Sequence, residues 1–435
     1  MSIKLDGRPR FEAATKVDAA PLGARLDFPF SKRSAPNRFL NAAMSERLAS
    51  YDKDDVTKSG IPSKELIRLY ERWGQGGWGQ VLTGNVQIHP HHLEAEGNPI
   101  IPSDAPFSGP RFDAFRELAT KAKANGSLIV AQVSHPGRQV PDTIQKHPIS
   151  ASAIPMTKSS VPMSFATPRA ATREDIDLVV EGFAHAAEYL EKTGFDGIEL
   201  HGAHGYLIAQ FLSPTSNHRT DEYGGSLENR MRLVLEIASA IKKRVSSSFI
   251  LGIKVNSVEF QDKGFTTEEA ILLCQALEKA EFDYVETSGG TYESTGFKHA
   301  KESTIKRENF FIEWAAQIAS ALTKTKVYTT GGFRTVAAML DTLKEVDGVG
   351  IGRAATQEPD LVHAILKGGA QGILQFSLPE DQFLQRLMLS AYQIGQIGRD
   401  EEITDGSNHE ATQEALAKIM AAHAAAVAPQ GTVAA

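Results

Sequence analysis

Eight short apolar runs rich in β-forming residues recur along this chain, and helical patterns separate most of them. Several runs are apolar throughout rather than alternating, which is typical of strands buried on both faces of a parallel sheet. Eight successive strand–helix units favour a closed (β/α)8 TIM barrel, with an open doubly wound sheet as the alternative. The runs cover residues 39–44, 80–86, 128–133, 197–202, 250–255, 284–289, 326–330 and 348–353.

Amphipathic helical patterns fill the gaps, and two of them begin with a capping signal. Thr172 and Asp175 have the spacing of a capping box, which satisfies amide groups left unpaired in the first helical turn. Thr266 and Glu269 have the same spacing. The expected helices cover residues 174–194, 227–245, 267–280, 309–322 and 335–346.

The pattern divides the chain into three parts. We expect an N-terminal extension of residues 1–36 at the barrel base, a barrel of residues 37–370, and a C-terminal extension of residues 371–435 with a peripheral helix and a tail. The interval between the third and fourth runs is long and rich in Pro, Ser and Thr. It predicts an excursion over the barrel mouth, as a lid or as a passive surface loop.

Composition excludes several classes of protein. Lys and Arg number 46 against 53 Asp and Glu, and no compact basic run could follow a phosphate backbone, so we expect no nucleic-acid partner. The charged N-terminal sequence and the absence of 18 consecutive apolar residues predict a soluble, cytoplasmic protein without a membrane span. Cys274 is the only cysteine, so the chain forms no internal disulfide and cannot itself supply four thiolates to an iron–sulfur cluster.

Gly74, Gly76 and Gly79 form a G-x-G-x-x-G sequence, but it follows a helix and precedes a strand, the reverse of a phosphate-binding turn. We interpret it as a tight loop. Residues 194–230 are more informative, because the fourth run ends near His201 and is followed by His204 and Tyr206. Residues at the carboxyl end of a barrel strand face the active site.

Two imidazoles and a phenol at that place suit hydrogen bonding to a carbonyl oxygen and delivery of a proton. A metal pair is the alternative, although no third ligand is evident nearby and the H-E-x-x-H spacing is absent.

The sequence HGAHGYLIAQFLSPTSNHRTDEYGGSLENR (residues 201–230) resembles the signature of the Old Yellow Enzyme family, and the resemblance extends from about Pro36 to about Ala370. It implies an FMN-dependent ene-reductase in which hydride passes from NADPH or NADH through FMN to the C=C bond of an α,β-unsaturated carbonyl compound. The single cysteine separates the chain from larger relatives that carry an iron–sulfur cluster. The alternatives are a dihydroorotate dehydrogenase-like FMN barrel, a metal-dependent barrel hydrolase and a catalytically silent FMN-binding protein; a monomer and a homodimer are both compatible.

The resemblance assigns roles to individual residues. His201 and His204 would bind the substrate's carbonyl oxygen, and Tyr206 would donate a proton to the α-carbon. Gln132 would contact the flavin pyrimidine, since an amide offers both a donor and an acceptor. Lys254 would lie near flavin N1 and O2, where relatives often carry arginine, so the flavin potential is in question.

Further flavin contacts are implied along the first two strands. Ala42, Ala43, Met44 and Ser45 would lie along the isoalloxazine, and the Ser45 hydroxyl would bond near O4. Gly84 would leave room for the ring, or would serve strand packing instead.

The ends of the last two strands would bind the FMN phosphate through Gly331, Gly332, Gly352 and Arg353, because glycines expose amide groups to anions. Residues 155–169 and 292–298 would select the alkene. The histidines of the HPHH sequence, His89, His91 and His92, would line the mouth or lie on the surface.

Overall fold

The computed structural model describes residues 7–13, 15–156, 159, 163–258, 264–289 and 312–427. Eight parallel strands close into a barrel, because β13 pairs with β3, β3 with β4, and β4 with β6. The barrel strands are β3 (Phe39–Asn41), β4 (Gln80–Leu82), β6 (Leu128–Ser134), β9 (Gly197–Gly202), β10 (Ile250–Val258), β11 (Tyr284–Gly289), β12 (Lys326–Thr330) and β13 (Gly348–Ile351). The predicted TIM-barrel class is confirmed, and each predicted run overlaps one barrel strand.

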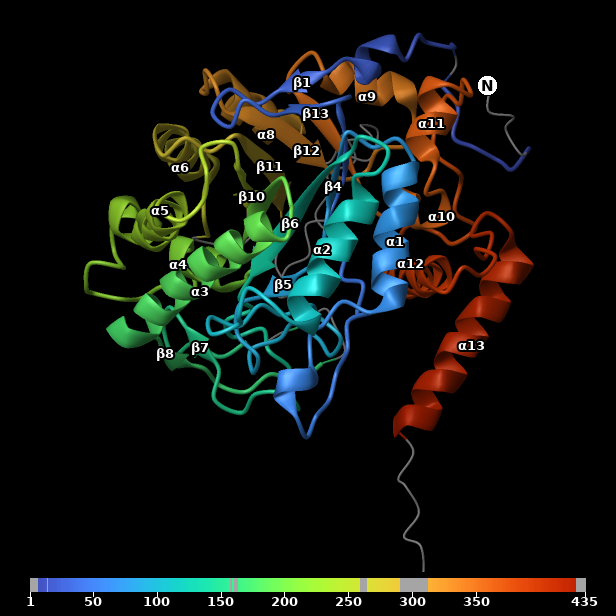
Figure 1. Ribbon diagram of the computed structural model, residues 1–435. Helices are drawn as coiled ribbons and strands as arrows, with labels where there is room; N and C mark the ends of the chain where they lie inside the picture. Colours follow the sequence, from blue (N-terminus) through green and yellow to red (C-terminus); the bar gives the residue numbers. More distant parts are fainter. Residues whose placement is uncertain are drawn as a thin grey trace, which may run out of the picture.

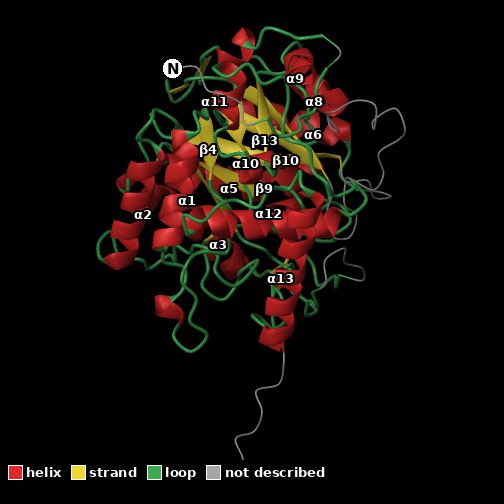
Figure 2. Cartoon of the chain, turned by 90° about the vertical axis from the view of Figure 1, so that its right-hand side faces the viewer, coloured by secondary structure: helices red, strands yellow, loops and turns green. Residues whose placement is uncertain are grey.

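Helices surround the strands on the outside of the barrel (Figure 2). Thr172 and Asp175 form the complete capping box predicted from the sequence. Thr266 accepts the Glu269 amide as predicted, but the Glu269 carboxylate contacts Arg230 instead of completing the box. The main barrel helices are α1 (Lys64–Gln75), α2 (Pro110–Ala122), α3 (Arg173–Lys192), α5 (Leu227–Lys242), α6 (Thr267–Lys279), α8 (Ile312–Ser320), α9 (Val336–Thr342) and α11 (Leu361–Leu366).

Short elements complete the loops. Gly74, Gly76 and Gly79 lie at the junction between α1 and β4, as the loop interpretation requires. The short elements are η1 (Ala20–Gly23), β1 (Leu26–Asp27), β2 (Ser34–Ala35), η2 (Val56–Lys58), β5 (Val86–Gln87), β7 (Ile149–Ser150), β8 (Arg169–Ala170), α4 (Leu207–Leu212) and α10 (Ala354–Gln357).

The N-terminal hairpin β1–β2 packs against the base of the barrel. Phe28 joins a buried interior cluster that includes Tyr284 and Tyr328, and the two tyrosine rings meet edge to face at 5.6 Å. Each tyrosine occupies the space left by a glycine on the neighbouring strand: a Cβ at Gly252 would overlap the Tyr284 ring, and one at Gly348 the Tyr328 ring. Strands β7 and β8, in the excursion between β6 and α3, lie at the opposite end of the molecule (Figure 1).

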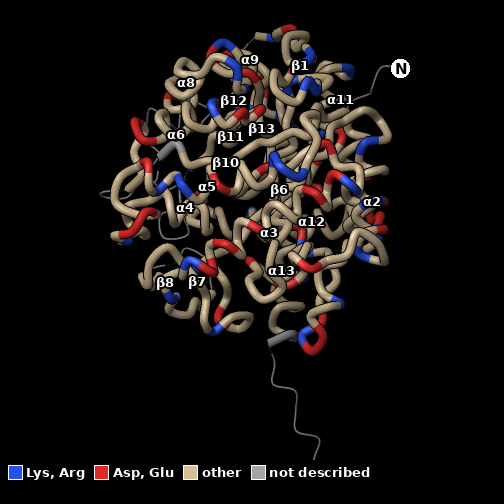
Figure 3. Tube along the Cα trace, turned by 60° about the vertical axis from the view of Figure 1, so that its left-hand side comes forward, with Lys and Arg blue, Asp and Glu red and all other residues tan. Residues whose placement is uncertain are grey.

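The C-terminal extension contains α12 (Phe383–Gly398) and α13 (His409–Val427), and α12 packs against α1 and α10. Helix α13 projects along the side of the barrel (Figure 1). Acidic and basic residues are interspersed over the described chain (Figure 3). Among the described helices, none combines the length and the apolar character needed to span a bilayer.

Candidate active site

The barrel interior changes from apolar to polar toward the carboxyl ends of the strands. His201 on β9 lies in register with Lys254 on β10, and Lys254 lies in register with Glu286 on β11. One level closer to the base, Gln132 on β6 is in register with Glu199 on β9. Because alternate residues of a strand share one face, these side chains all point into the barrel.

The structure brings the three predicted catalytic side chains together. His201 Nε2 lies 3.1 Å from His204 Nδ1, and the rings of His201 and Tyr206 are 4.4 Å apart at their centroids. His201 belongs to β9, whereas Tyr206 is the N-cap residue of α4. Their exposed fractions are 5% and 4%, so the water around this cluster is limited.

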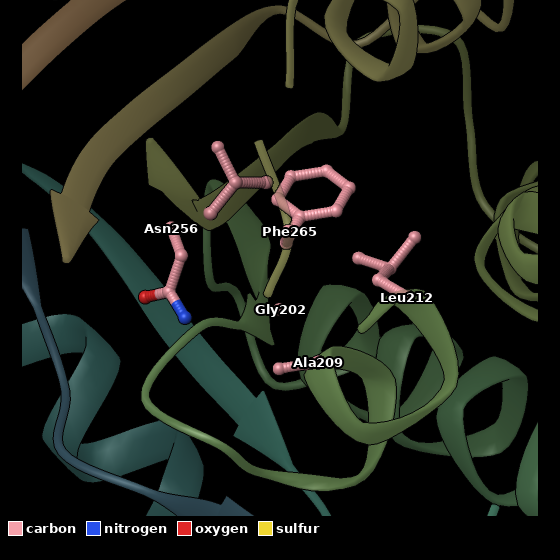
Figure 4. A pocket seen from close by; sticks show the side chains of 6 residues that line it. Gly202, Ala209, Leu212, Asn256 and Phe265 are labelled. Carbon is pink, nitrogen blue, oxygen red and sulfur yellow. The ribbon is translucent and has the colours of Figure 1, made fainter. Parts of the chain in front are cut away.

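The backbone of His204 adopts the left-handed conformation, with φ of 57°. This conformation is unfavourable for a residue with a Cβ and persists where neighbours hold it. The Asn256 side chain stabilises this conformation, because its Oδ1 accepts a hydrogen bond from the His204 amide at 3.1 Å. Asn256 also lines a small depression between β9, β10 and α4, whose other walls are mainly apolar (Figure 4).

Hydrogen bonds continue from the histidine pair on both sides. His204 Nε2 is 2.9 Å from Ser288 Oγ, and His201 Nδ1 is 2.8 Å from Asn85 Oδ1. Since an amide oxygen only accepts, His201 carries its proton on Nδ1 and accepts at Nε2 from His204 Nδ1. His204 Nε2 then accepts from the Ser288 hydroxyl, so both rings are neutral and each has one N–H.

The electrostatics of the site agree with neutral imidazoles. Burial, followed by the positive charge of Lys254, lowers the pKa of His204 to about 3. Burial also holds the pKa of His201 well below its usual range, with smaller contributions from His204 and Lys254. The pair therefore acts through hydrogen bonds rather than as cations at neutral pH.

Ser45 extends this network away from the histidines. Asn85 Nδ2 donates to Ser45 Oγ at 3.4 Å, and the Ser45 hydroxyl donates to Glu94 Oε2 at 3.0 Å. Glu94 is buried and also contacts Arg47. The Ser45 proton is thus directed to Glu94 in the structure, and the predicted bond from Ser45 toward flavin O4 stays a prediction.

Each of the two polar residues predicted to contact the flavin ring is held by a carboxyl group on a neighbouring strand. Gln132 Nε2 donates to Glu199 Oε1 at 2.8 Å. Lys254 Nζ lies 2.9 Å from Glu286 Oε1, and an ammonium retains two further donors. Both side chains keep hydrogen-bonding capacity for a ligand at the mouth.

The segment after β3, which is predicted to lie along the flavin ring, forms a hydrogen bond with the last strand, β13. The Ala42 amide donates to Ile351 O at 3.0 Å, and Ala43 and Met44 follow along the chain. A Cβ at Gly352 would lie 3.8 Å from Met44 Sδ, so these two predicted contacts are neighbours.

Gly84, in contrast, packs against protein. A Cβ there would overlap Glu46 Oε2 at 2.3 Å and Met44 O at 2.4 Å, which is the packing explanation considered for this glycine. Its predicted contact with a flavin ring stays a prediction.

Arginines gather around the ends of β12 and β13. Gly331 and Gly332 have φ of 127° and 83°, as the turn after β12 requires. Arg353 lies over the Phe383 ring at the start of α12, and burial together with the charge of Arg386 lowers the pKa of Arg353 to about 10.

Arg386 comes from the C-terminal extension and was not anticipated. It lies 3.9 Å from Glu380, which also pairs with Arg334. Its Nε is buried and has no hydrogen-bond partner among the described residues. The guanidinium groups of Arg353 and Arg386 repel each other, and the buried Nε of Arg386 needs an acceptor. An anion bound between the two arginines would satisfy both requirements.

These residues fit FMN. The arginines suit the phosphate, and Gln132 and Lys254 offer donors at the centre of the mouth for the ring. Asn85, Ser288 and Asn256 were missed by sequence reasoning, since a polar residue at a strand end carries no signal of its partner.

Of the HPHH histidines, His89 is half-buried and His92 is buried, both next to His135, whereas His91 is exposed. His92 Nδ1 is 3.1 Å from His89 Nδ1, and the rings of His92 and His135 are 4.8 Å apart. No cluster of three or more His, Cys, Asp or Glu side chains in the described chain has metal-binding geometry. Of the two segments expected to select the alkene, residues 292–298 and part of 155–169 lie outside the described residues.

Known proteins are similar to this chain in sequence and in fold. The model of the NADH:flavin oxidoreductase / NADH oxidase family matches residues 30–371. The chain belongs to this family. The resemblance to the Old Yellow Enzyme family is thereby confirmed, and membership implies flavin-dependent oxidoreduction with FMN and a nicotinamide reductant.

Members of the NADH:flavin oxidoreductase family from fungi are similar over most of the chain. "NADH-dependent flavin oxidoreductase nadA" of Aspergillus parasiticus is 51% identical over 401 residues, covering 92% of this chain and 90% of that protein. "NADH-dependent flavin oxidoreductase iccE" of Talaromyces variabilis is 35% identical and covers 76% and 83%. A solved 2-naphthoyl-CoA reductase has a TM-score of 0.73 at 22% identity, covering 91% of this chain and 58% of its own, and supports the fold alone.

Proposed function

We propose that this protein is an ene-reductase that uses NADH to reduce FMN and then reduces the C=C bond of an α,β-unsaturated carbonyl compound. The convergence of His201, His204 and Tyr206 at the end of β9 carries this proposal. The names of the similar fungal relatives favour NADH over NADPH as the donor.

Bound FMN would supply the hydride chemistry, accepting hydride from the nicotinamide and passing it to the alkene. The protein's own contribution is to bind and polarise the substrate. A carbonyl oxygen placed at the histidine pair takes over the His204 Nδ1–H that His201 Nε2 accepts in the structure. Rotation of the Asn85 amide would move the His201 proton to Nε2 and provide a second donor.

Two neutral donors suit negative charge that develops on the carbonyl oxygen. His201 is buried and His204 is half-buried, so both act in a site with little water, where a hydrogen bond to developing charge is strong. Tyr206 packs against His201, so its hydroxyl belongs to the same cluster and is the proposed proton donor to the α-carbon.

Residues around the ring and phosphate would hold FMN in place. Arg353, with Gly331 and Gly332, would bind the phosphate, and Gln132 and Lys254 would bind the pyrimidine edge. This arrangement leaves the histidine pair and Tyr206 for the substrate.

Anaerobic mixing experiments test the proposal. The purified yellow protein should be bleached by NADH and recover its colour when a cyclic enone, a maleimide or a quinone is added. Recovery with quinones alone would contradict alkene reduction, and a protein that does not bind FMN would contradict the whole assignment.

A further inference from the structure

A charged layer lies inside the barrel, and the proposed mechanism does not use two of its members. Glu199 and Glu286 have no exposed surface, and Lys254 is 4% exposed. All three side chains point into the barrel from adjacent strands. Burying such groups is costly unless their charges balance, so their protonation states are constrained.

The hydrogen bonds distinguish the two carboxyl groups. Glu286 Oε1 accepts from Lys254 Nζ at 2.9 Å and from Thr330 Oγ1 at 2.5 Å. Gly350 makes room for this hydroxyl, because a Cβ there would overlap Thr330 Oγ1. Glu286 therefore has a cationic donor and a hydroxyl donor on one oxygen, as an ionised carboxylate requires.

Glu199 has a different environment. Its Oε1 accepts from the neutral amide of Gln132, whereas its Oε2 and the Oε2 of Glu286 are both buried without a hydrogen-bond partner among the described residues. Burial, followed by the negative charge of Glu286, raises the pKa of Glu199 well above its usual value. Two buried carboxyl groups that repel each other cannot both ionise cheaply, and one shared proton would satisfy both unpartnered Oε2 atoms.

We propose that Glu199 and Glu286 share one proton, so that the pair carries a single negative charge that neutralises Lys254 beneath the flavin. The layer is then electrically neutral, and Lys254 exerts a weaker attraction on the reduced flavin than an unpaired cation would. This inference rests on the proposed place of FMN at the barrel mouth. It makes Glu199 and Glu286 positioning residues that set the flavin potential without touching the substrate.

Sharing a proton has a specific consequence for substitution. In Glu286→Gln the remaining Glu199 can ionise and pair with Lys254, and in Glu199→Gln the Glu286 carboxylate is already paired. Either single change leaves the layer neutral. The double variant Glu199→Gln/Glu286→Gln leaves Lys254 without a counter-ion from this pair, so only the double change strengthens the cation.

Sulfite, which adds to oxidised flavin and leaves a negative charge on the ring, reports that strength as a dissociation constant. A unit charge at about 10 Å in an effective dielectric constant of about 20 changes a binding constant roughly tenfold. We expect both single variants to bind sulfite within about twofold of wild type and the double variant to bind it about tenfold more tightly. Similar, additive gains in the single variants would mean two ionised carboxylates and would overturn the proposal.

Infrared difference spectra provide a test that does not depend on the flavin. The wild-type protein should show the D2O-sensitive carbonyl band of one protonated carboxylic acid, and this band should be absent from both single variants. Lys254→Met should strengthen the band, because the pair then keeps two protons. If wild type minus Glu199→Gln shows no such band, proton sharing is wrong even where FMN binds as proposed; a colourless protein that shows the band would contradict the flavin site alone.

Discussion

The Nδ1 atom of His201 lies 2.8 Å from Oδ1 of Asn85, a residue 116 positions earlier in the chain. This contact determines which imidazole nitrogen carries the proton, because the amide oxygen can only accept. The other nitrogen, Nε2, is the one that faces His204. The donor strength of the histidine pair therefore depends on a side chain that need not touch the substrate.

Asn85→Asp should make alkene reduction pH-dependent. A carboxylate beside Nδ1 favours the imidazolium and raises the pKa of His201 from its depressed value toward the ordinary range. Below that pKa, Nε2 carries a proton and donates to the carbonyl oxygen. The rate constant for reoxidation by an enone should rise as the pH falls from 8 to 5, in anaerobic stopped-flow measurements.

Asn85→Leu is the matched control, because it removes the amide without adding a charge. It should slow the same step about tenfold, the effect of one lost hydrogen bond, and introduce no new pH dependence. Identical pH profiles for wild type and Asn85→Asp would show that Asn85 does not govern the His201 proton.

Tyr206→Phe should slow reoxidation by an enone at least about a hundredfold, the usual contribution of a general acid, while reduction by NADH changes little. The reason is that only the alkene step requires a proton from the phenol. Single-turnover absorbance traces separate the two steps. Tyr223→Phe removes another buried hydroxyl, which bonds to Glu236 at 2.8 Å, and should leave both steps unchanged. Equal slowing of both steps in Tyr206→Phe would contradict the proton-donor role.

The strands could be predicted because a parallel barrel buries both faces of each strand, and runs such as residues 128–133 are apolar in consequence. The Thr172 cap could be predicted because its partner is three residues away. The contact of the Glu269 side chain could not be predicted, because its partner Arg230 lies on another helix.

The same distinction applies to the site. His201, His204 and Tyr206 lie within a stretch of six residues at the end of a single strand. Glu286 contacts Lys254 only because β10 and β11 pair in one particular register, and nothing in the run 284–289 specifies that register. The place of Arg386 near Arg353 could not be predicted without knowing where α12 packs. Local signals were sufficient to place the proposed proton donor Tyr206 beside His201 but not to identify the residues that surround the pair.

Mild acid should destabilise the fold through the histidines near the mouth. Burial lowers the pKa of His89 to about 4 and that of His92 to about 3, so both are neutral in the folded protein. In the unfolded chain they bind protons below about pH 6.5. The unfolded state therefore gains protons as the pH falls through 6.5, stability decreases, and the loss stops only below the folded pKa values.

Between pH 7.5 and 5.5 each of these two histidines should reduce the free energy of unfolding by about 1 kcal/mol. Urea unfolding of wild type and His92→Gln at the two pH values measures the difference. The variant should lose less stability on acidification than wild type does. His409→Gln, which replaces an exposed histidine, provides the control. Equal losses in wild type and His92→Gln would show that His92 is protonated in the folded protein.

Arg386→Ala should weaken FMN binding without affecting riboflavin. Arg386 brings a guanidinium from α12 toward Arg353, and its buried Nε has no acceptor among the described residues. A phosphate would supply that acceptor, and a charge-assisted hydrogen bond of this kind is worth about tenfold to a hundredfold in affinity. Fluorescence titration of the flavin-free protein with FMN and with riboflavin isolates the contribution of the phosphate.

Arg399→Ala is a suitable control from the opposite end of the same helix, because its guanidinium pairs with Glu401 at the surface. It should leave both dissociation constants unchanged. Arg386→Lys should bind FMN with intermediate affinity, since it keeps the charge but loses the planar fork. If Arg386→Ala weakens FMN and riboflavin by the same factor, the arginine supports the packing of α12 against the barrel and does not bind the phosphate.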